Sequence, residues 1–541
     1  MRETRGAASR NGWRASPLSL RSLSLSSDSL RSREGSFRRL LSGDALQRKP
    51  SRGRGRRDEE EGREEQTFTF QEAVDVIGFG RFHVLLMVLC AFGWFAEITE
   101  LVINGFVAPS VQRAFDLTPI QYGVFGSSSF VGMAAGAAFW GYVSDRFGRR
   151  ISFSLTPWTT FVGGFLSALA PNYWTLLLLR FTAAFGIGGM LPVDLAHVVE
   201  FLPTKWRGRN LVMVDAIGMV PALLFASSLG VFFSSGQGGG EGDGEGPGQG
   251  EGSTAWRMML AVGALPAALF GVVRSWVPES PRWDMTNDEL AGAIRTLQSV
   301  ARINGRGARV PQGRLLPLEG ERAQGSVVAR VRELFTPALR GITPRLWAMA
   351  ICAQFASAGT AYALPKLLEV TLHTAPQRVA KIQMVGVCGV VPLLGLAFLI
   401  IERSRLRALA YFYALASAAT AVLALGCYVR HEMLAVLGFV VVRGAIEGIF
   451  AVKNCIGAEA YPTCVRASGL SVGSLGNDIG GMLSPLLWGV MSESFGTAIL
   501  FMVIMASVFM LGVWPTLTMP YDNGGRAIQD RHVQLAAIVS S

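Results

Sequence analysis

The chain has 541 residues, of which 50% are hydrophobic and only 16% are charged. Soluble domains carry roughly a quarter charged residues, so this deficit excludes an ordinary soluble protein and indicates a surface that faces lipid. The formal net charge of +11 does not indicate nucleic-acid binding, because much of the excess lies in the N-terminal tail and in short loops. The 6 cysteines show no paired C-x-x-C spacing, which argues against a zinc site and a disulfide framework.

Residues 1–66 are rich in Arg and Ser and lack apolar periodicity. Such a segment cannot bury enough apolar surface to offset the entropy lost on ordering, so we expect it to be disordered. Acidic residues are scarce before Asp58, which also fits an organelle transit peptide. A plain cytoplasmic tail is the commoner case for such a composition.

Long apolar runs begin at His83 and alternate with short polar joints. About 20 apolar residues cross a bilayer as a helix, so each run predicts one transmembrane span. The first six predicted spans are residues 83–107, 121–143, 151–170, 174–198, 210–233 and 257–277, and the second six are 346–369, 380–401, 408–428, 434–457, 467–490 and 497–517. The sequence therefore predicts an all-α membrane protein with twelve transmembrane helices in two six-helix bundles.

The spans set the expected domain boundaries. We expect a disordered basic tail (1–66), an N-terminal bundle (67–277), a cytoplasmic linker with short amphipathic helices (278–345), a C-terminal bundle (346–519) and a C-terminal tail (520–541). In the linker, residues 287–303 place Leu290, Ile294, Leu297 and Val300 at helical spacing. This pattern predicts an amphipathic helix that lies against the inner membrane face.

The distribution of cations predicts the orientation of the spans. Alternate joints, expected to be inner loops, hold Arg146, Arg149 and Arg150, then Lys205, Arg207 and Arg209, then Arg403, Arg405 and Arg407. The other joints are poor in Lys and Arg, and the one at 234–255 is Gly-rich and acidic. Positive charge in short loops stays inside, so both termini are expected in the cytoplasm of a multi-pass protein. The plasma membrane and an intracellular vesicle or organelle membrane remain alternatives.

The stretch from Gly141 to Arg150 separates the second and third predicted spans. We expect a tight inner loop in which Gly141 and Gly148 let the helices approach and the chain turn, with Asp145 among cations that it can pair with. A basic loop that only fixes topology is the simpler interpretation. The full G-x-x-x-D-R-x-G-R-R spacing is more specific, and it resembles the signature loop between helices two and three of the major facilitator superfamily of transporters.

An internal repeat supports the two-bundle arrangement. Glu200 to Arg207 and Glu459 to Arg466 share the spacing E-x-x-P-T-x-x-R, and each follows the fourth span of its half. A duplicated six-helix unit is typical of secondary transporters, in which the ligand site lies between the halves. Chance recurrence of a Pro-ended helix with a basic loop is the alternative.

Further motifs narrow the resemblance. Arg180-x5-Gly-x-Gly-Gly in the fourth span and Pro278-Glu279-Ser-Pro-Arg282-Trp after the sixth resemble the sugar-porter and organic-ion branches of the superfamily. The segments 77–82, 96–109, 200–203 and 333–337 resemble the synaptic vesicle 2-related transporters, and the similarity runs from about residue 70 to about 520. One departure is the second-half counterpart of the signature loop, which keeps Glu402 and Arg403 but lacks the glycine.

Several ionisable residues lie inside the predicted spans, where a charge costs a few kcal/mol and needs a partner or water. Glu97 and Glu100 are three residues apart in the first span and so share one helix face. Two neighbouring acids suit reversible protonation, so one of them is a candidate to carry a coupling proton or to attract a cationic substrate. A structural pair bonded to neighbouring helices is the alternative.

The fourth and tenth spans carry the other charged groups. Arg180 is either an interfacial arginine that extends to the membrane surface or a ligand contact. Asp194 and His197 are compatible with a proton relay, although a satisfied pair near the interface is the simpler interpretation. In the tenth span, Arg443 and Glu447 are one turn apart and can neutralise each other, while Lys453 lacks an opposite charge within a turn.

The resemblance implies that the first, fourth, seventh and tenth helices line one aqueous cavity. It would place Glu97, Glu100 and Lys453 around that space, where an acid–base pair across the halves could form and break as they rock. Asp478 is a further candidate, or it helps to hold the inner gate, and Gln354 and Tyr362 could donate hydrogen bonds to a solute. The residues expected to act in gating are Gly141, Asp145, Arg146, Gly148, Arg149, Arg150, Glu200, Arg207, Glu279, Arg282, Glu402, Arg403, Glu459 and Arg466.

Together these features predict a secondary active transporter of a small polar or organic-ion solute that works by alternating access, with coupling to protons as one option. The alternative is a non-transporting membrane sensor or vesicle-trafficking protein that retains the fold. No nucleophile–base or metal-ligand constellation stands out, so we expect neither an enzyme nor a cofactor or metal site. The expected partners are the lipid bilayer, the solute and protons, with no nucleic acid, and we expect a monomer.

Overall fold

The computed structural model describes residues 67–203, 207–235, 251–274, 279–286, 289–307, 314–316, 332, 334–336, 339–401, 403–461, 466–491 and 495–520. The predicted disordered tail (1–66) and nearly all of the C-terminal tail lie outside this part of the chain. Within it, helices dominate, and the one sheet consists of two short parallel strands, β1 (Thr67–Phe68) and β2 (Arg314–Leu315).

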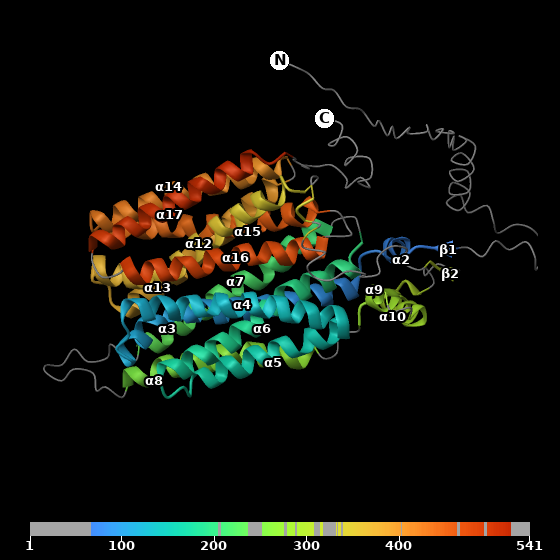
Figure 1. Cartoon of the computed structure of the whole chain (residues 1–541), viewed down its shortest axis with the longest axis horizontal. Helices are drawn as coiled ribbons and strands as arrows, with labels where there is room; N and C mark the ends of the chain where they lie inside the picture. The colour runs from blue at the N-terminus through green and yellow to red at the C-terminus, as the bar shows by residue number, and fades with distance from the viewer. Residues whose placement is uncertain are drawn as a thin grey trace, which may run out of the picture. The chain divides into compact units, whose positions relative to one another are not determined.

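Twelve long helices of 19 to 34 residues lie side by side in the described part of the chain (Figure 1). The N-half comprises α3 (Arg81–Ala114), α4 (Pro119–Phe147), α5 (Arg149–Ser167), α6 (Tyr173–Phe201), α7 (Arg207–Ser235) and α8 (Glu251–Arg274). The C-half comprises α12 (Thr343–Leu372), α13 (Pro376–Ile400), α14 (Arg405–Tyr428), α15 (Glu432–Ala460), α16 (Arg466–Met491) and α17 (Phe495–Leu517). Each predicted span falls on one of these helices, which confirms the twelve-helix prediction.

Hydropathy supports a membrane location for these helices. Among the described residues, 7 helices are long and apolar enough to cross a bilayer by length and composition. Polar caps mark where several of the long helices begin. Thr118 accepts a hydrogen bond from the Gln121 amide ahead of α4, and Asn172 accepts one from the Thr175 amide ahead of α6. These caps place helix starts within a few residues of the starts predicted from the apolar runs.

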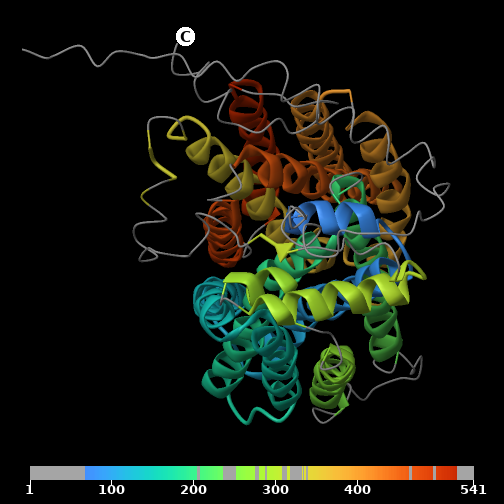
Figure 2. The same ribbon diagram turned by 90° about the vertical axis from the view of Figure 1, so that its right-hand side faces the viewer.

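The two halves meet mainly along three pairs of helices, α3 with α12, α4 with α16, and α7 with α13, with smaller contacts of α7 with α15 and of α6 with α16. Viewed end-on in Figure 2, the helices of the N-half and those of the C-half form two neighbouring groups. Small residues let the backbones approach where α4 crosses α16. A Cβ added to Gly489 would lie 2.4 Å from the Pro119 carbonyl oxygen, so this contact excludes any side chain.

Three short helices gather at one end of the bundle, which we call the linker end; the opposite end is the far end. They are α2 (Phe70–Ile77), α9 (Pro281–Thr286) and α10 (Leu290–Ile303), and Figure 2 shows α10 lying across this end. The buried face of α10 includes Leu297 and Val300, and it packs in one apolar cluster with Phe70 and Val74 of α2. The structure therefore has the expected helix, and the buried part of its apolar face packs on α2 and α9. Contact of this helix with the inner membrane face stays a prediction.

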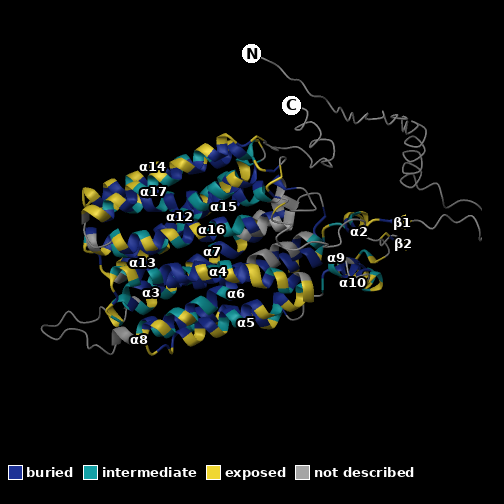
Figure 3. Ribbon diagram, in the orientation of Figure 1, coloured by how far each residue is buried: buried dark blue, intermediate teal, exposed yellow. Residues whose placement is uncertain are grey.

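A single asparagine ties the linker to the first long helix. The Asn304 side chain, just after α10, accepts a hydrogen bond from the Phe82 amide (2.9 Å) and donates one to the Gly78 carbonyl (3.3 Å). Arg306 donates to the Ile77 carbonyl at 2.7 Å. These bonds satisfy backbone groups between α2 and α3 that would otherwise be unpaired, so the linker end of α3 is fixed from outside the bundle. Figure 3 shows buried residues along the length of the long helices.

The turn between α4 and α5 is shorter than predicted. Instead of a ten-residue loop, α4 continues through Phe147 and α5 begins at Arg149, so the chain turns at Gly148 alone, which has φ = 105°. This backbone conformation favours glycine. A Cβ on Gly141 would meet nothing within 4 Å, so Gly141 is not a point of close helix approach. The prediction failed here because polar residues extend a helix beyond the apolar span that hydropathy detects.

Candidate functional site

The first buried charge pair joins α3 and α6. Arg180 Nη1 lies 2.8 Å from Glu100 Oε2, and Arg180 Nη2 donates to the Glu100 carbonyl at 3.2 Å. The two side chains are 2% and 1% exposed, so Arg180 does not extend to the membrane surface. A Cβ added to Gly164 of α5 would lie 2.3 Å from Glu100 Oε1. Glu100 is therefore enclosed by helices of its own half.

The second buried pair joins α6 and α8, and sequence reasoning missed its cation. Arg274, the last residue of α8, forms an ion pair with Asp194 and donates to the Phe153 carbonyl at 3.0 Å. Its guanidinium carbon lies 3.4 Å from the Phe153 ring centroid and 4.1 Å from that of Phe270. Arg274 is fully buried. The available signal was its position inside the predicted span 257–277, three residues from its end.

Glu97 and His197 lie close to this second pair. Glu97 is 4% exposed and interacts electrostatically with Arg274. The His197 ring packs against those of Phe153 and Phe201, with centroid separations of 5.0 and 5.2 Å. Among the described residues, neither ring nitrogen of His197 has a hydrogen-bond partner. The predicted Asp194–His197 pair is therefore replaced by an Asp194–Arg274 pair.

The C-half holds its charges differently. Arg443 Nη2 lies 2.9 Å from Glu447 Oε1, one turn along α15, as the spacing predicted. Lys453 donates to Asn477 Oδ1 of α16 at 3.0 Å and lies 5.1 Å from the Phe450 ring centroid. Asp478, the next residue on α16, is 4% exposed. Lys453 is thus placed against the neighbouring helix of its own half.

Neutral hydrogen bonds cross between the halves in the part of the bundle nearer the far end. The Asn104 amide of α3 donates to Tyr362 Oη of α12 at 2.7 Å and to Ser129 Oγ of α4 at 2.8 Å. Ser127 Oγ donates to the Met482 carbonyl of α16 at 2.7 Å. Tyr362 therefore contacts the N-half directly. Gln354, two turns earlier on α12, is half-buried.

A small cavity opens between α3, α7, α8, α12 and α13 close to the far end. Its volume is about 60 Å³, and Arg113 and Glu369 are the charged residues that line it. This space holds a few water molecules at most. It is too small for a solute of sugar size.

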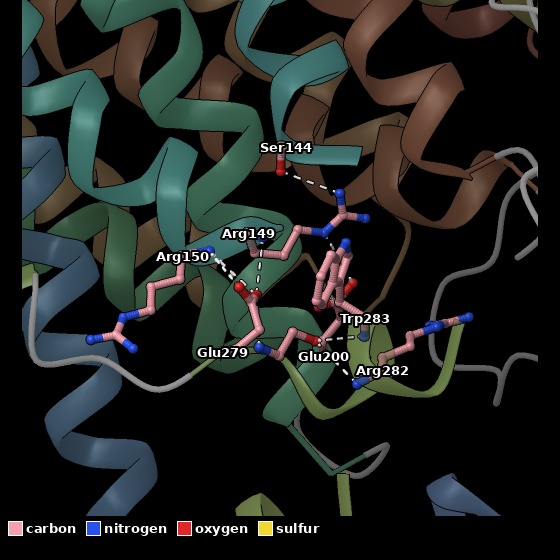
Figure 4. Close-up of polar contacts among 8 residues, drawn as sticks. Ser144, Arg149, Arg150, Glu200, Glu279, Arg282 and Trp283 are labelled. Atoms are coloured by element: carbon pink, nitrogen blue, oxygen red, sulfur yellow. Dashed lines mark hydrogen bonds and ion pairs between the residues drawn. The ribbon is translucent and has the colours of Figure 1, made fainter. Parts of the chain in front are cut away.

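At the linker end, Glu279 caps the start of α5 (Figure 4). Its Oε1 accepts a hydrogen bond from the Arg149 amide at 3.0 Å, and its Oε2 accepts one from the Arg150 amide at 3.0 Å. A carboxylate in this position satisfies unpaired amides and the positive end of the helix dipole. A Cβ on Gly148 would lie 2.7 Å from Glu279 Oε2, which gives a second reason for glycine at the turn.

The Arg149 side chain extends this cluster to α6 and α4. Its Nε lies 3.9 Å from Glu200 Oε1, and its Nη1 donates to Ser144 Oγ at 3.2 Å. The Arg282 amide, at the start of α9, donates to Ser280 Oγ at 3.2 Å. Of the other predicted gating residues, Arg146, Arg150 and Arg403 are exposed. Glu402 and the side chains of Asp145, Arg207, Glu459 and Arg466 lie outside the described residues.

Asp284 of α9 is a titratable group that sequence reasoning did not single out. Burial raises its pKa to about 6, and the nearby charges of Glu279 and Glu289 act in the same direction. Arg295 opposes this effect. The charge of Asp284 therefore changes near pH 6.

Residues 76–522 match the family described as "Sugar (and other) transporter". The chain belongs to this transporter family. Among its relatives, the synaptic vesicle 2-related protein of Rattus norvegicus is 29% identical over 86% of this chain and 83% of the relative. The organic cation/carnitine transporter 7 of Arabidopsis thaliana is 28% identical over 86% of this chain and 96% of the relative.

Solved structures of a sugar transporter share the fold. The proton:xylose symporter XylE bound to 6-bromo-6-deoxy-D-glucose superposes with a TM-score of 0.66 at 17% identity, over 85% of this chain and 100% of that chain. The partially occluded inward-open XylE from E. coli gives a TM-score of 0.65 at 17% identity, over 82% of this chain and 99% of that chain. The family member described here is therefore a multi-pass membrane transporter with the major facilitator fold, in a family of transporters and not of enzymes.

Proposed function

We propose that this chain is a secondary active transporter of a small polar or organic-ion solute, working by alternating access and coupled to protons. The names of its relatives support a solute of this class, since they include a transporter of organic cations or carnitine and a proton:xylose symporter. In this proposal the bundles at 67–277 and 346–519 move as two bodies joined by the linker at 278–345. The linker end faces the cytoplasm.

One observation carries the proposal: each buried ion pair among the described residues lies within one half, and none of them joins the two halves. Glu100–Arg180 and Asp194–Arg274 lie within the N-half, and Arg443–Glu447 lies within the C-half. Between the halves, α3 and α4 meet α12 and α16 through neutral hydrogen bonds such as Asn104–Tyr362, together with a charge-assisted bond from Lys366 of α12 to Gln112 of α3 at 3.0 Å, and none of these contacts is an ion pair. Breaking a buried ion pair costs about 3–5 kcal/mol, whereas a neutral hydrogen bond contributes about 1 kcal/mol. The halves can therefore part at the far end while each keeps its charges paired.

The same arrangement assigns roles to the predicted residues. Protonation of Glu100 would remove its charge-assisted bond to Arg180, which links charge state to the packing of α3 on α6. Tyr362 and Gln354 on α12 would offer neutral hydrogen bonds to a solute when the halves separate. Arg149, Glu200 and Glu279 would hold the linker ends of α4, α5 and α6 together as a gate. Lys453 and Asp478 would interact with the bound solute from the side of the C-half.

Reconstituted liposomes containing a pH-sensitive dye test the proposal. Pools of sugars, amines and carboxylates are added outside, and we expect at least one pool to drive proton movement. The double variant Glu97→Gln, Glu100→Gln should abolish the dye response. Asp116→Asn is the matched control, because Asp116 is an exposed acid at the far end. Absence of a response to every pool, with folded protein, would contradict the proposal and favour a non-transporting sensor.

A further inference from the structure

Two acidic side chains from two helices of the N-half lie close to Arg274 of α8. Asp194 of α6 forms an ion pair with it, and Glu97 of α3 interacts with it electrostatically. The helices are in close contact here, since a Cβ added to Gly93 of α3 would lie 2.7 Å from Asp194 Oδ2. Gly93 precedes Glu97 by about one helical turn. The two carboxylates are therefore both placed close to one guanidinium.

Arg274 has one N–H group that is available to a second acid in addition to Asp194. Its Nη1 donates to the Phe153 carbonyl at 3.0 Å and to Thr156 Oγ1 at 3.4 Å. Its Nε is buried and has no hydrogen-bond partner among the described residues. A buried guanidinium N–H without an acceptor is costly, so this atom indicates that a further acceptor can approach it.

The charges around Arg274 do not balance when both acids are ionised. Glu97 and Asp194 would carry two negative charges against one positive charge. The other groups facing the site are the Cys90 thiol on α3, the His197 ring on α6, and the Phe153 carbonyl and Thr156 hydroxyl on α5. His197 is itself near the positive charge of Arg149, and Glu100 already has Arg180. An uncompensated charge in a buried membrane site is strongly unfavourable.

We propose that Glu97, Asp194 and Arg274 together bind one proton. Arg274 stays cationic, one carboxylate pairs with it, and the other is held as a neutral carboxylic acid. On release, the O–H bond of that acid breaks, the proton passes to water, and the new carboxylate takes up the free Nε–H of Arg274. The proton belongs to the pair of acids and not to one of them. This site is distinct from the Glu100–Arg180 pair. The identification of its proton with the transported proton rests on the proposed function.

Infrared difference spectroscopy on the full-length protein in lipid nanodiscs tests the proposal without a solute. A protonated carboxyl group absorbs at a higher frequency than a carboxylate and shifts on exchange into D₂O. We expect the wild type to show this band at neutral pH. Glu97→Gln and Asp194→Asn should each lose it, because the remaining acid then pairs with Arg274. Glu100→Gln should keep it, since Glu100 has its own cation.

Three results would overturn the proposal: no band in the wild type, a band that persists in both Glu97→Gln and Asp194→Asn, or loss of the band in Glu100→Gln. Thermal unfolding shows whether each variant is folded. If Asp194→Asn does not fold, the band in Glu97→Gln alone tests the proposal, because glutamine imitates the neutral form of the acid. If the band behaves as expected but no solute moves protons in liposomes, the shared proton stands and the proposed coupling fails. Coupled transport without the band would overturn this inference alone.

Discussion

The two halves of the bundle have the same number of long helices but hold their buried charges differently. In the N-half, Glu100–Arg180 and Asp194–Arg274 each join two helices and connect residues 80 positions apart. In the C-half, Arg443–Glu447 lies within a single helix, and the Arg443 side chain is 15% exposed. Cross-helix pairs fix how α3, α6 and α8 pack, whereas a pair within one turn fixes nothing beyond its own helix. The N-half is therefore the better candidate for a rigid charge-sensing body.

The largest effect should come from Arg274. In Arg274→Gln, the two buried acids Glu97 and Asp194 lose the cation that they share, and we expect a loss of about 3–5 kcal/mol in the free energy of unfolding. Arg443→Gln is the matched change in the C-half, and it should cost less because Arg443 is partly exposed. Thermal unfolding in lipid nanodiscs measures both. Equal losses in the two variants would remove the contrast between the halves.

The turn at Gly148 offers the next test. Gly148→Ala forces a side chain into a left-handed backbone conformation and toward Glu279, and we expect a loss of about 1–3 kcal/mol. Gly141→Ala, seven residues earlier in the same motif, should be neutral or slightly stabilising, because its Cβ meets open space within a helix. Thermal unfolding compares the pair. A loss in Gly141→Ala as large as that in Gly148→Ala would show that the turn is not at Gly148.

Hydrogen bonds between the halves should have a smaller effect. Tyr362→Phe removes the bond from Asn104 and should cost about 1 kcal/mol, which corresponds to a roughly fivefold change in the population of states open at the far end. Tyr413→Phe removes a bond to the Met349 carbonyl inside the C-half and is the control. Hydrogen–deuterium exchange of the α12 segment around Tyr362 should rise in Tyr362→Phe only, because the bond lost in the control lies near the other end of α12, at Met349. The same rise in both variants would contradict a specific role between the halves.

The smallest expected effect concerns pH at the linker. The folded pKa of Asp284, about 6, lies above its ordinary value of 3.8, so the acid is bound more tightly as its neutral form in the folded protein. Its contribution to stability is therefore fully present below about pH 4 and is lost as the pH rises through 6. Asp284→Asn should be more stable than the wild type at pH 7 by about 1 kcal/mol, and equal to it at pH 4. A difference that is constant with pH would exclude this titration.

Local pattern predicted the parts of the molecule that depend on near neighbours. Apolar runs located the twelve helices, the i, i+4 spacing predicted Arg443–Glu447, and the glycine in the signature motif predicted the turn at Gly148. The Asp194–Arg274 pair was not predictable, because nothing in either segment indicates that the last residue of α8 reaches α6 at that height. An amphipathic pattern shows that one face of α10 is covered, but not whether lipid or α2 covers it. Gly141 was wrongly predicted to lie in the loop, because hydropathy does not detect a helix that continues into polar residues.

The most direct test of the central claim, that the N-half carries the coupling proton, compares two fluxes in liposomes with any solute that the wild type accepts. In Glu97→Gln, we expect the solute-driven dye response to disappear while exchange of labelled solute across the membrane persists, because exchange needs no net movement of protons. Asp116→Asn should retain both fluxes. A dye response of wild-type size in Glu97→Gln would contradict the claim.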